Sequence, residues 1–192
     1  KMFVSENLGV NENGHLTIGG IDTVDLAQEY GTPLYVMDEQ VIRSNLRRFH
    51  ESMQKYYDGK GEVHYASKAF SCLEMCRIVA SEGDGLDAVS IGELYTAVKA
   101  GFSMEKVGFH GNNKTDADIV FAMEQVVGCF VADNEEELCR INAFAGERGI
   151  RQSVLLRLTP GIDTHTYAAV NTGKVDSKFG LAIETGQAMD LT

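Results

Sequence analysis

Short apolar runs alternate along this chain with longer segments in which apolar residues recur every three or four positions. This alternation is typical of repeated strand–helix units. The apolar runs predict strands at residues 33–38, 63–69, 85–90, 107–110, 129–132 and 153–158. The intervening periodicity predicts helices at residues 39–57, 72–81, 91–99, 115–125 and 134–148.

Strands that are separated by single helices form right-handed parallel units. Two architectures are built this way, the open doubly wound sheet and the eight-stranded barrel. No G-x-G-x-x-G segment opens a helix here, which disfavours a dinucleotide-binding sheet. The spacing of about 22–25 residues per unit agrees with a barrel of about 250 residues. We therefore predict an α/β fold, a (β/α)8 TIM barrel that is incomplete, with about six strand–helix units.

The first 30 residues do not follow the alternation. Residues 15–20 predict a strand with a turn, and residues 24–30 a short helix. We expect residues 1–30 to belong to a second, β-type domain and residues 31–192 to form the partial barrel. Residues 184–189 begin a further helix close to the last residue. We therefore expect the chain to be truncated before the last barrel units.

Composition and charge narrow the classes of function. The 192 residues are 44% hydrophobic, which is enough for a globular core. A formal charge of −11 without a Lys/Arg-rich stripe disfavours nucleic-acid and anionic-membrane partners and leaves small molecules. No apolar run approaches the roughly 18 residues of a membrane span, and no signal core opens the chain. The four cysteines lack metal-ligand spacing, so we expect reduced thiols in a cytoplasmic protein and no metal.

Residues with reactive or charged side chains lie at the C-terminal ends of the predicted strands. In a barrel of this type these ends surround one opening, the mouth of the barrel. We expect residues 63–69 to form a short buried strand that ends on Lys68. A buried ammonium is costly, but at a barrel mouth burial and neighbouring cations favour the free amine, which attacks carbonyls. The other polar residues at the mouth are Asp87, Ser90, His110 and Arg157.

Each of these residues also has a structural interpretation, which the sequence leaves open. Lys68 could extend to solvent or pair with a carboxylate, and Asp87 could cap a strand end. Ser90 could be a helix N-cap with Glu93 completing a capping box. His110 could be a hydrogen-bonded core histidine, and Arg157 a buried ion-pair partner.

Five segments together resemble one enzyme family. They are YASKA at residues 65–69, GLDAVSIGEL at 85–94, HGNNK at 110–114, TPGIDTHT at 159–166 and NTGKVDSKFG at 171–180. The series resembles the diaminopimelate decarboxylases, in the alanine-racemase-like, fold-type III group of pyridoxal-phosphate enzymes, from about residue 31 to residue 180. The first segment is shared with ornithine and arginine decarboxylases, whereas the third and the last two are more specific to the diaminopimelate branch.

The resemblance implies a role for each matching residue. Lys68 would carry pyridoxal 5'-phosphate as a Schiff base, Asp87 would lie beside the cofactor, and Ala66 would leave room for its ring. His110 and Arg157 would line the cofactor mouth. Lys178 falls where relatives form subunit contacts, which implies a homodimer.

The implied reaction is decarboxylation of meso-2,6-diaminopimelate to L-lysine and carbon dioxide in lysine biosynthesis. The family's ring-stacking histidine, glycine-rich phosphate loop, ring-nitrogen glutamate, substrate-clamping arginine, and site cysteine and tyrosine would all follow Thr192. We therefore expect residues 1–192 alone to be inactive. The sequence leaves three alternatives open: a decarboxylase of ornithine, arginine or carboxynorspermidine, a non-catalytic pyridoxal-phosphate-binding protein, and a cofactor-free Schiff-base aldolase.

Overall fold

The computed structural model describes residues 5–162 and 179–190. By internal contacts the chain divides into two compact units, Lys1–Gly61 and Glu62–Thr192. The predicted domain boundary between residues 30 and 31 stays a prediction.

The N-terminal unit contains a three-stranded antiparallel sheet in the order β1-β2-β3. Its strands are β1 (Leu8–Val10), β2 (Leu16–Ile18) and β3 (Ile21–Asp22), followed by α1 (Thr23–Tyr30) and α2 (Glu39–Tyr57). The predicted strand within residues 15–20 is therefore confirmed, as are both helices. The strands β1 and β3 were not predicted from the sequence.

Residues 33–38 were predicted as a strand, and this prediction is wrong. The segment is assigned to neither a strand nor a helix, and no described residue pairs with it. A strand needs a ladder partner, which an apolar run does not by itself supply. Tyr35 in this segment is 97% exposed, and Asp38 caps α2 by accepting the backbone N–H of Gln40 at 2.9 Å.

The C-terminal unit is built on a five-stranded parallel sheet. Its strands are β4 (His64–Ala66), β5 (Gly85–Ala88), β6 (Val107–Phe109), β7 (Cys129–Ala132) and β8 (Ser153–Leu156). They are hydrogen-bonded in chain order, without the reversal of strand order that defines a doubly wound sheet. Next along the chain, β9 (Leu158–Thr159) pairs in parallel with β10 (Leu181–Ala182). The order is that of a barrel wall, as predicted.

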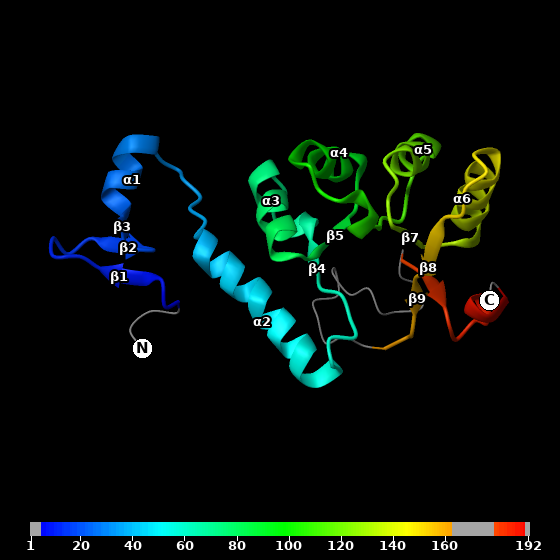
Figure 1. The fold of residues 1–192 in the computed structure, drawn as a ribbon, viewed down its shortest axis with the longest axis horizontal. Helices are drawn as coiled ribbons and strands as arrows, with labels where there is room; N and C mark the ends of the chain where they lie inside the picture. The colour runs from blue at the N-terminus through cyan, green and yellow to red at the C-terminus, as the bar shows by residue number, and fades with distance from the viewer. Residues whose placement is uncertain (1–4, 163–178, 191–192) are drawn as a thin grey trace. The chain divides into compact units, whose positions relative to one another are not determined.

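Helices lie in a row along one face of this sheet (Figure 1). They are α3 (Leu73–Glu82), α4 (Ile91–Ala100), α5 (Asp116–Glu124) and α6 (Glu135–Glu147), and the short helix α7 (Gln187–Asp190) follows β10. The side chains of Cys72, Ser90, Thr115 and Asn134 accept backbone N–H groups at the four helix starts. In the described ranges, no helix combines the length and the apolar character needed to cross a membrane.

The hydrophobic core lies between these helices and the outer face of the sheet. Phe109 and Phe130 pack with ring centroids 5.8 Å apart at 57°, a tilted arrangement that aromatic rings favour. Leu86 lies on the same face, because its partner across the ladder is Val107, and Val107 and Phe109 are two positions apart in β6. These four residues are at most 1% exposed.

The inner face of the sheet is polar where β4, β5 and β6 meet. Partner residues on neighbouring strands share a face, and faces alternate along a strand. His64 and Gly85 are partners, as are Asp87 and Gly108, so all four point inward. A Cβ on Gly85 would collide with the His64 imidazole, and a Cβ on Gly108 would lie 3.1 Å from Asp87 Oδ1. The two glycines thus make room for polar side chains.

Candidate active site

A cavity of about 590 Å³ opens at the C-terminal ends of these strands. It brings together the five site residues predicted from the sequence, Ala66, Lys68, Asp87, His110 and Arg157. Its wall is completed by Val89, Gly111, Asn112, Val131 and Phe179. This volume lies within the range of about 300–1,000 Å³ that is usual for small-molecule sites.

Lys68 does not lie in a buried strand, which corrects the prediction for residues 63–69. Strand β4 ends at Ala66, and Lys68 lies exposed in the 3₁₀ turn η1 (Ser67–Ala69). Within the described part of the chain β4 pairs only with β5, so its other edge is unpaired. In that same part, the Lys68 amine has no hydrogen bond or ion pair.

The turn that carries Lys68 is anchored by its neighbour. Ser67 is 1% exposed, and its hydroxyl contacts the backbone oxygen of Asp87 at 2.8 Å and Glu93 Oε2 at 2.7 Å. The same Glu93 oxygen also accepts a hydrogen bond from the Val89 N–H at 2.6 Å. The backbone at Lys68 is therefore held to β5 and α4, while its amine stays available.

Asp87 lies between two imidazoles. Its Oδ1 is 2.9 Å from His64 Nδ1 and 3.5 Å from His110 Nε2. Burial alone would raise the pKa of Asp87, but the hydrogen bonds with His110 and His64 outweigh it and hold that pKa well below its usual range. Asp87 therefore presents an ionised carboxylate to the cavity at neutral pH.

Arg157 lies between β8 and β9, where its backbone N–H still donates to Ala132 O at 2.9 Å. Its guanidinium stacks on Phe179 at 4.2 Å from the ring centroid, and NH1 is 3.7 Å from Asp133 Oδ1. The same Asp133 oxygen accepts the Gly180 N–H at 2.9 Å. Arg157 is thus both an ion-pair partner and a cation at the cavity wall, but it is half-buried rather than buried as the structural interpretation expected.

Two remaining candidates from the sequence differ from this group. Ser90 does not line the cavity; its Oγ accepts the Glu93 N–H at 3.3 Å, which makes it the N-cap of α4. The capping box predicted with Glu93 is not formed as expected, because the Glu93 carboxylate binds Val89 and Ser67 instead. Lys178 lies outside the described residues.

Three residues of this region were not predicted from the sequence: His64, Ser67 and Asp133. A signal for His64 was present, because it precedes Ala66 by two positions and therefore shares its face of the strand. Likewise, Asp133 follows Val131 by two positions. Applying the period of two to the polar residues would have identified both.

The residues at the cavity fit an anionic aldehyde cofactor. An amine without a partner is the group that condenses with a carbonyl, and a stacked guanidinium is a group that binds phosphate. The side chains of His64, Asp87 and His110 lie together but, in the described ranges, do not form a cluster that could hold a metal ion.

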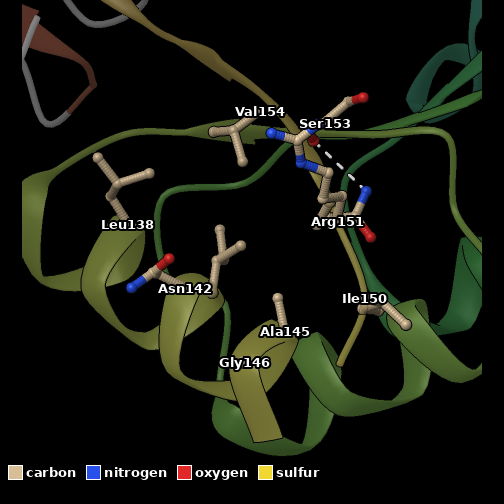
Figure 2. Close-up of a pocket in the computed structure, with 10 residues that line it drawn as sticks. Leu138, Asn142, Ala145, Gly146, Ile150, Arg151, Ser153 and Val154 are labelled. Carbon is tan, nitrogen blue, oxygen red and sulfur yellow. Dashed lines mark hydrogen bonds between the residues drawn. The ribbon is translucent and has the colours of Figure 1, made fainter. Parts of the chain in front are cut away.

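A second cavity, of about 530 Å³, lies between α6 and β8 (Figure 2). Its labelled lining includes Leu138, Ile150 and Val154, and Arg151 is the one charged residue among the described residues that line it. None of these described lining residues carries a carboxylate, an imidazole or a thiol. This cavity does not carry the acid–base groups that distinguish the site at Lys68.

Comparison with known proteins identifies the family. The profile described as "Pyridoxal-dependent decarboxylase, pyridoxal binding domain" matches residues 41–192. The chain belongs to this family. The description of the family names pyridoxal, an aldehyde.

Named relatives point to one branch. The chain is 48% identical over 187 residues to a diaminopimelate decarboxylase of Bacillus methanolicus, covering 97% of this chain and 43% of that protein. It is 45% identical to the enzyme of Bacillus subtilis (strain 168), covering 97% and 42%. The crystal structure of diaminopimelate decarboxylase from M. jannaschii with L-lysine matches with a TM-score of 0.86 at 35% identity, covering 98% of this chain and 44% of that chain.

These matches confirm the predicted barrel and its alanine-racemase-like type. The chain spans about two fifths of the length of the curated relatives that it matches. A lysine/ornithine decarboxylase structure from Vibrio vulnificus, at 22% identity and a TM-score of 0.69, shares the fold.

Proposed function

We propose that this chain supplies the coenzyme-binding lysine of an enzyme that decarboxylates meso-2,6-diaminopimelate to L-lysine and carbon dioxide. The single observation that carries the proposal is Lys68. Its amine lines a cavity of about 590 Å³ without a partner among the described residues, while its backbone is fixed through Ser67. A Schiff-base lysine needs an anchored backbone and an amine that is not engaged in a hydrogen bond or an ion pair.

The remaining cavity residues have complementary roles in this proposal. When bound, pyridoxal 5'-phosphate supplies an electron sink for the electrons left by the departing carboxylate. Lys68 would hold the cofactor through its amine, and Ala66 would leave space beside it. The Asp87 carboxylate would favour cationic groups in the cavity, and Arg157 would attract an anionic group. His110 lies beside Asp87, where it would complete the polar wall.

The choice of diaminopimelate rests on the relatives. Those at 45–48% identity carry that name, whereas the lysine/ornithine decarboxylase at 22% supports the fold alone. The proposal extends to a homodimer in the cytoplasm. Four free thiols, at Cys72, Cys76, Cys129 and Cys139, agree with a reducing compartment.

The test uses the full-length polypeptide that contains this sequence, loaded with pyridoxal 5'-phosphate. Release of carbon dioxide is measured with meso-diaminopimelate, ornithine, arginine and carboxynorspermidine in parallel. We expect turnover with diaminopimelate that exceeds turnover with each of the others by at least about 100-fold. Lys68→Ala should remove turnover together with the visible absorbance of the bound cofactor.

Lys99→Ala is the matched control, because Lys99 is an exposed lysine on α4 that does not line the cavity. It should retain both signals. Wild-type turnover in Lys68→Ala would overturn the assignment of the lysine. Preferred turnover of ornithine or arginine would overturn the substrate, and cofactor binding without any turnover would favour a non-catalytic pyridoxal-phosphate-binding protein.

A further inference from the structure

The inner face of the sheet holds a titratable residue, His64, that the proposed function does not use. His64 is in β4, two positions before Ala66, and it is not among the residues that line the cavity. Its imidazole lies between two carboxylates. Nδ1 is 2.9 Å from Asp87 Oδ1, and Nε2 is 3.5 Å from Glu62 Oε2.

The local sequence makes room for this arrangement. The partner of His64 across the β4–β5 ladder is Gly85, and any Cβ at that position would collide with the imidazole. The φ angle of Gly85 is not in the left-handed region, so backbone conformation does not require glycine there. Space for the His64 ring is therefore the physical requirement that Gly85 meets.

An imidazole between two carboxylates is favoured as a cation, because both ring nitrogens then donate. The hydrogen bond with Asp87 is the largest influence on His64 and raises its pKa, with burial acting in the opposite direction and Glu62 adding to the increase. Glu62 is 85% exposed, so solvent screens its contribution to the raised pKa of His64. The decisive partner is Asp87.

We propose that His64 is a positioning residue that holds the Asp87 carboxylate at the cavity wall and neutralises it when protonated. The inference deepens the proposed function and rests on it for the identity of the cofactor. With His64 protonated, the pair carries no net charge. With His64 neutral, the pair carries one negative charge, which attracts the cations of the cavity.

Four other groups define the electrostatic surroundings of this pair. Glu62 precedes β4 and faces His64 Nε2, and His110 follows β6 and faces the same Asp87 oxygen. Lys68 and Arg157 line the cavity to which Asp87 contributes. Raising the pH through the His64 pKa therefore strengthens the attraction between Asp87 and the cations of the cavity.

The first experiment needs no cofactor. Histidine side-chain NMR of the full-length polypeptide, with assignment by the single histidine variants, follows the titration of His64. We expect its pKa to lie above the ordinary imidazole value and to fall in Asp87→Asn. A His64 titration that Asp87→Asn leaves unchanged overturns the inference, whatever the cofactor does.

The second experiment measures the dissociation constant of pyridoxal 5'-phosphate from about pH 5.5 to pH 8.5. In the wild type, a plot of this dissociation constant against pH should show a step at the pKa of His64. His64→Asn places an uncharged donor near the position of Nδ1, so it should keep the affinity above the step within about threefold but lose the step itself. His64→Ala should weaken binding about tenfold throughout, because the carboxylate loses a charge-assisted hydrogen bond.

Two further variants separate this role from a general structural one. Gly85→Ala should displace the His64 ring and also remove the step. His15→Asn disrupts a comparable pair in the N-terminal unit, where His15 Nδ1 is 2.8 Å from Asp22 Oδ2, and it should leave the step intact. A step that persists in both His64→Asn and Gly85→Ala contradicts the proposal. Failure of the wild type to bind the cofactor contradicts the proposed function, while the NMR result still decides the coupling of His64 to Asp87.

Discussion

Two lysines follow strands of the same parallel sheet, and their surroundings differ completely. Lys114 follows β6, is 3% exposed and uses its amine fully, with Glu137 Oε1 at 2.6 Å, Gly111 O at 2.7 Å and Val131 O at 2.8 Å. Lys68 follows β4, is exposed and has no partner among the described residues. An amine that donates three hydrogen bonds cannot attack a carbonyl, so of these two lysines Lys68 is the one available for that chemistry.

The comparison shows how one fold separates stability from function. Lys114 connects the loop after β6 to β7 and α6, and it lies 5.4 Å from the centroid of Phe109 in the core. At Lys68 the neighbouring Ser67 makes the structural contacts, and the lysine side chain is left out of them. After β4 the structural contacts are made by Ser67 and the proposed chemical role belongs to Lys68, whereas Lys114 has a structural role alone.

The largest expected effect is on stability at Lys114. Lys114→Met leaves the Glu137 carboxylate, 1% exposed, without its cation and should lower the free energy of unfolding by about 3–5 kcal/mol. Lys68→Met should change it by less than about 0.5 kcal/mol. Urea unfolding of the two variants measures both values. Combining Lys114→Met with Glu137→Leu removes the stranded charge and should recover much of the loss. Equal losses at the two lysines would break the comparison.

A smaller effect is expected at Ser90, which sequence analysis placed near the mouth. Because Ser90 caps α4, Ser90→Ala should cost about 1 kcal/mol of unfolding free energy and leave the affinity for pyridoxal 5'-phosphate unchanged. Thr115→Ala, which removes the N-cap of α5, is the matched control and should cost a similar amount. A tenfold loss of cofactor affinity in Ser90→Ala alone would move Ser90 from the structural group to the cavity group.

The smallest effect is the pH dependence of stability from His64 and Asp87. The pKa of Asp87 is lowered by folding, so its contribution is complete above the unfolded pKa of about 3.9 and is lost as the pH falls toward the folded value. The pKa of His64 is raised, so its contribution is complete below about pH 6.5 and is lost as the pH rises through the folded value. The pair therefore stabilises the fold most between about pH 4 and pH 6.5.

Because both side chains are partly exposed, we expect less than about 1 kcal/mol from this pair. Urea unfolding from pH 4 to pH 9 should show that His64→Asn removes the decline on the alkaline side of the window. An unchanged alkaline decline in this variant would show that His64 is not its source.

The barrel wall was predictable from sequence because local signals agreed there. Strand β7 and the helices that start after Ser90, Thr115 and Asn134 lie where the apolar periodicity placed them. Residues 33–38 failed because pairing is a tertiary property, and an apolar run shows only the tendency to form a strand. The burial expected at Lys68 failed for a similar reason: it depends on what covers β4, which residues 63–69 do not encode.

The candidate site was predictable as a set of residues, but its internal contacts were not. The strand-end rule found Lys68, Asp87, His110 and Arg157, and the structure brings them to one cavity. It could not distinguish Ser90, since a hydroxyl at a strand end serves equally as a helix cap. Their roles toward the cofactor stay predictions.

The most direct test of the central claim is to trap the lysine that binds the cofactor. The full-length polypeptide is loaded with pyridoxal 5'-phosphate, reduced with borohydride and digested, and the modified peptides are identified by mass spectrometry. We predict a pyridoxyl adduct on Lys68 and none on Lys114, whose amine is committed to Glu137 and two carbonyl groups. An adduct on Lys114, or on another lysine in place of Lys68, would contradict the account.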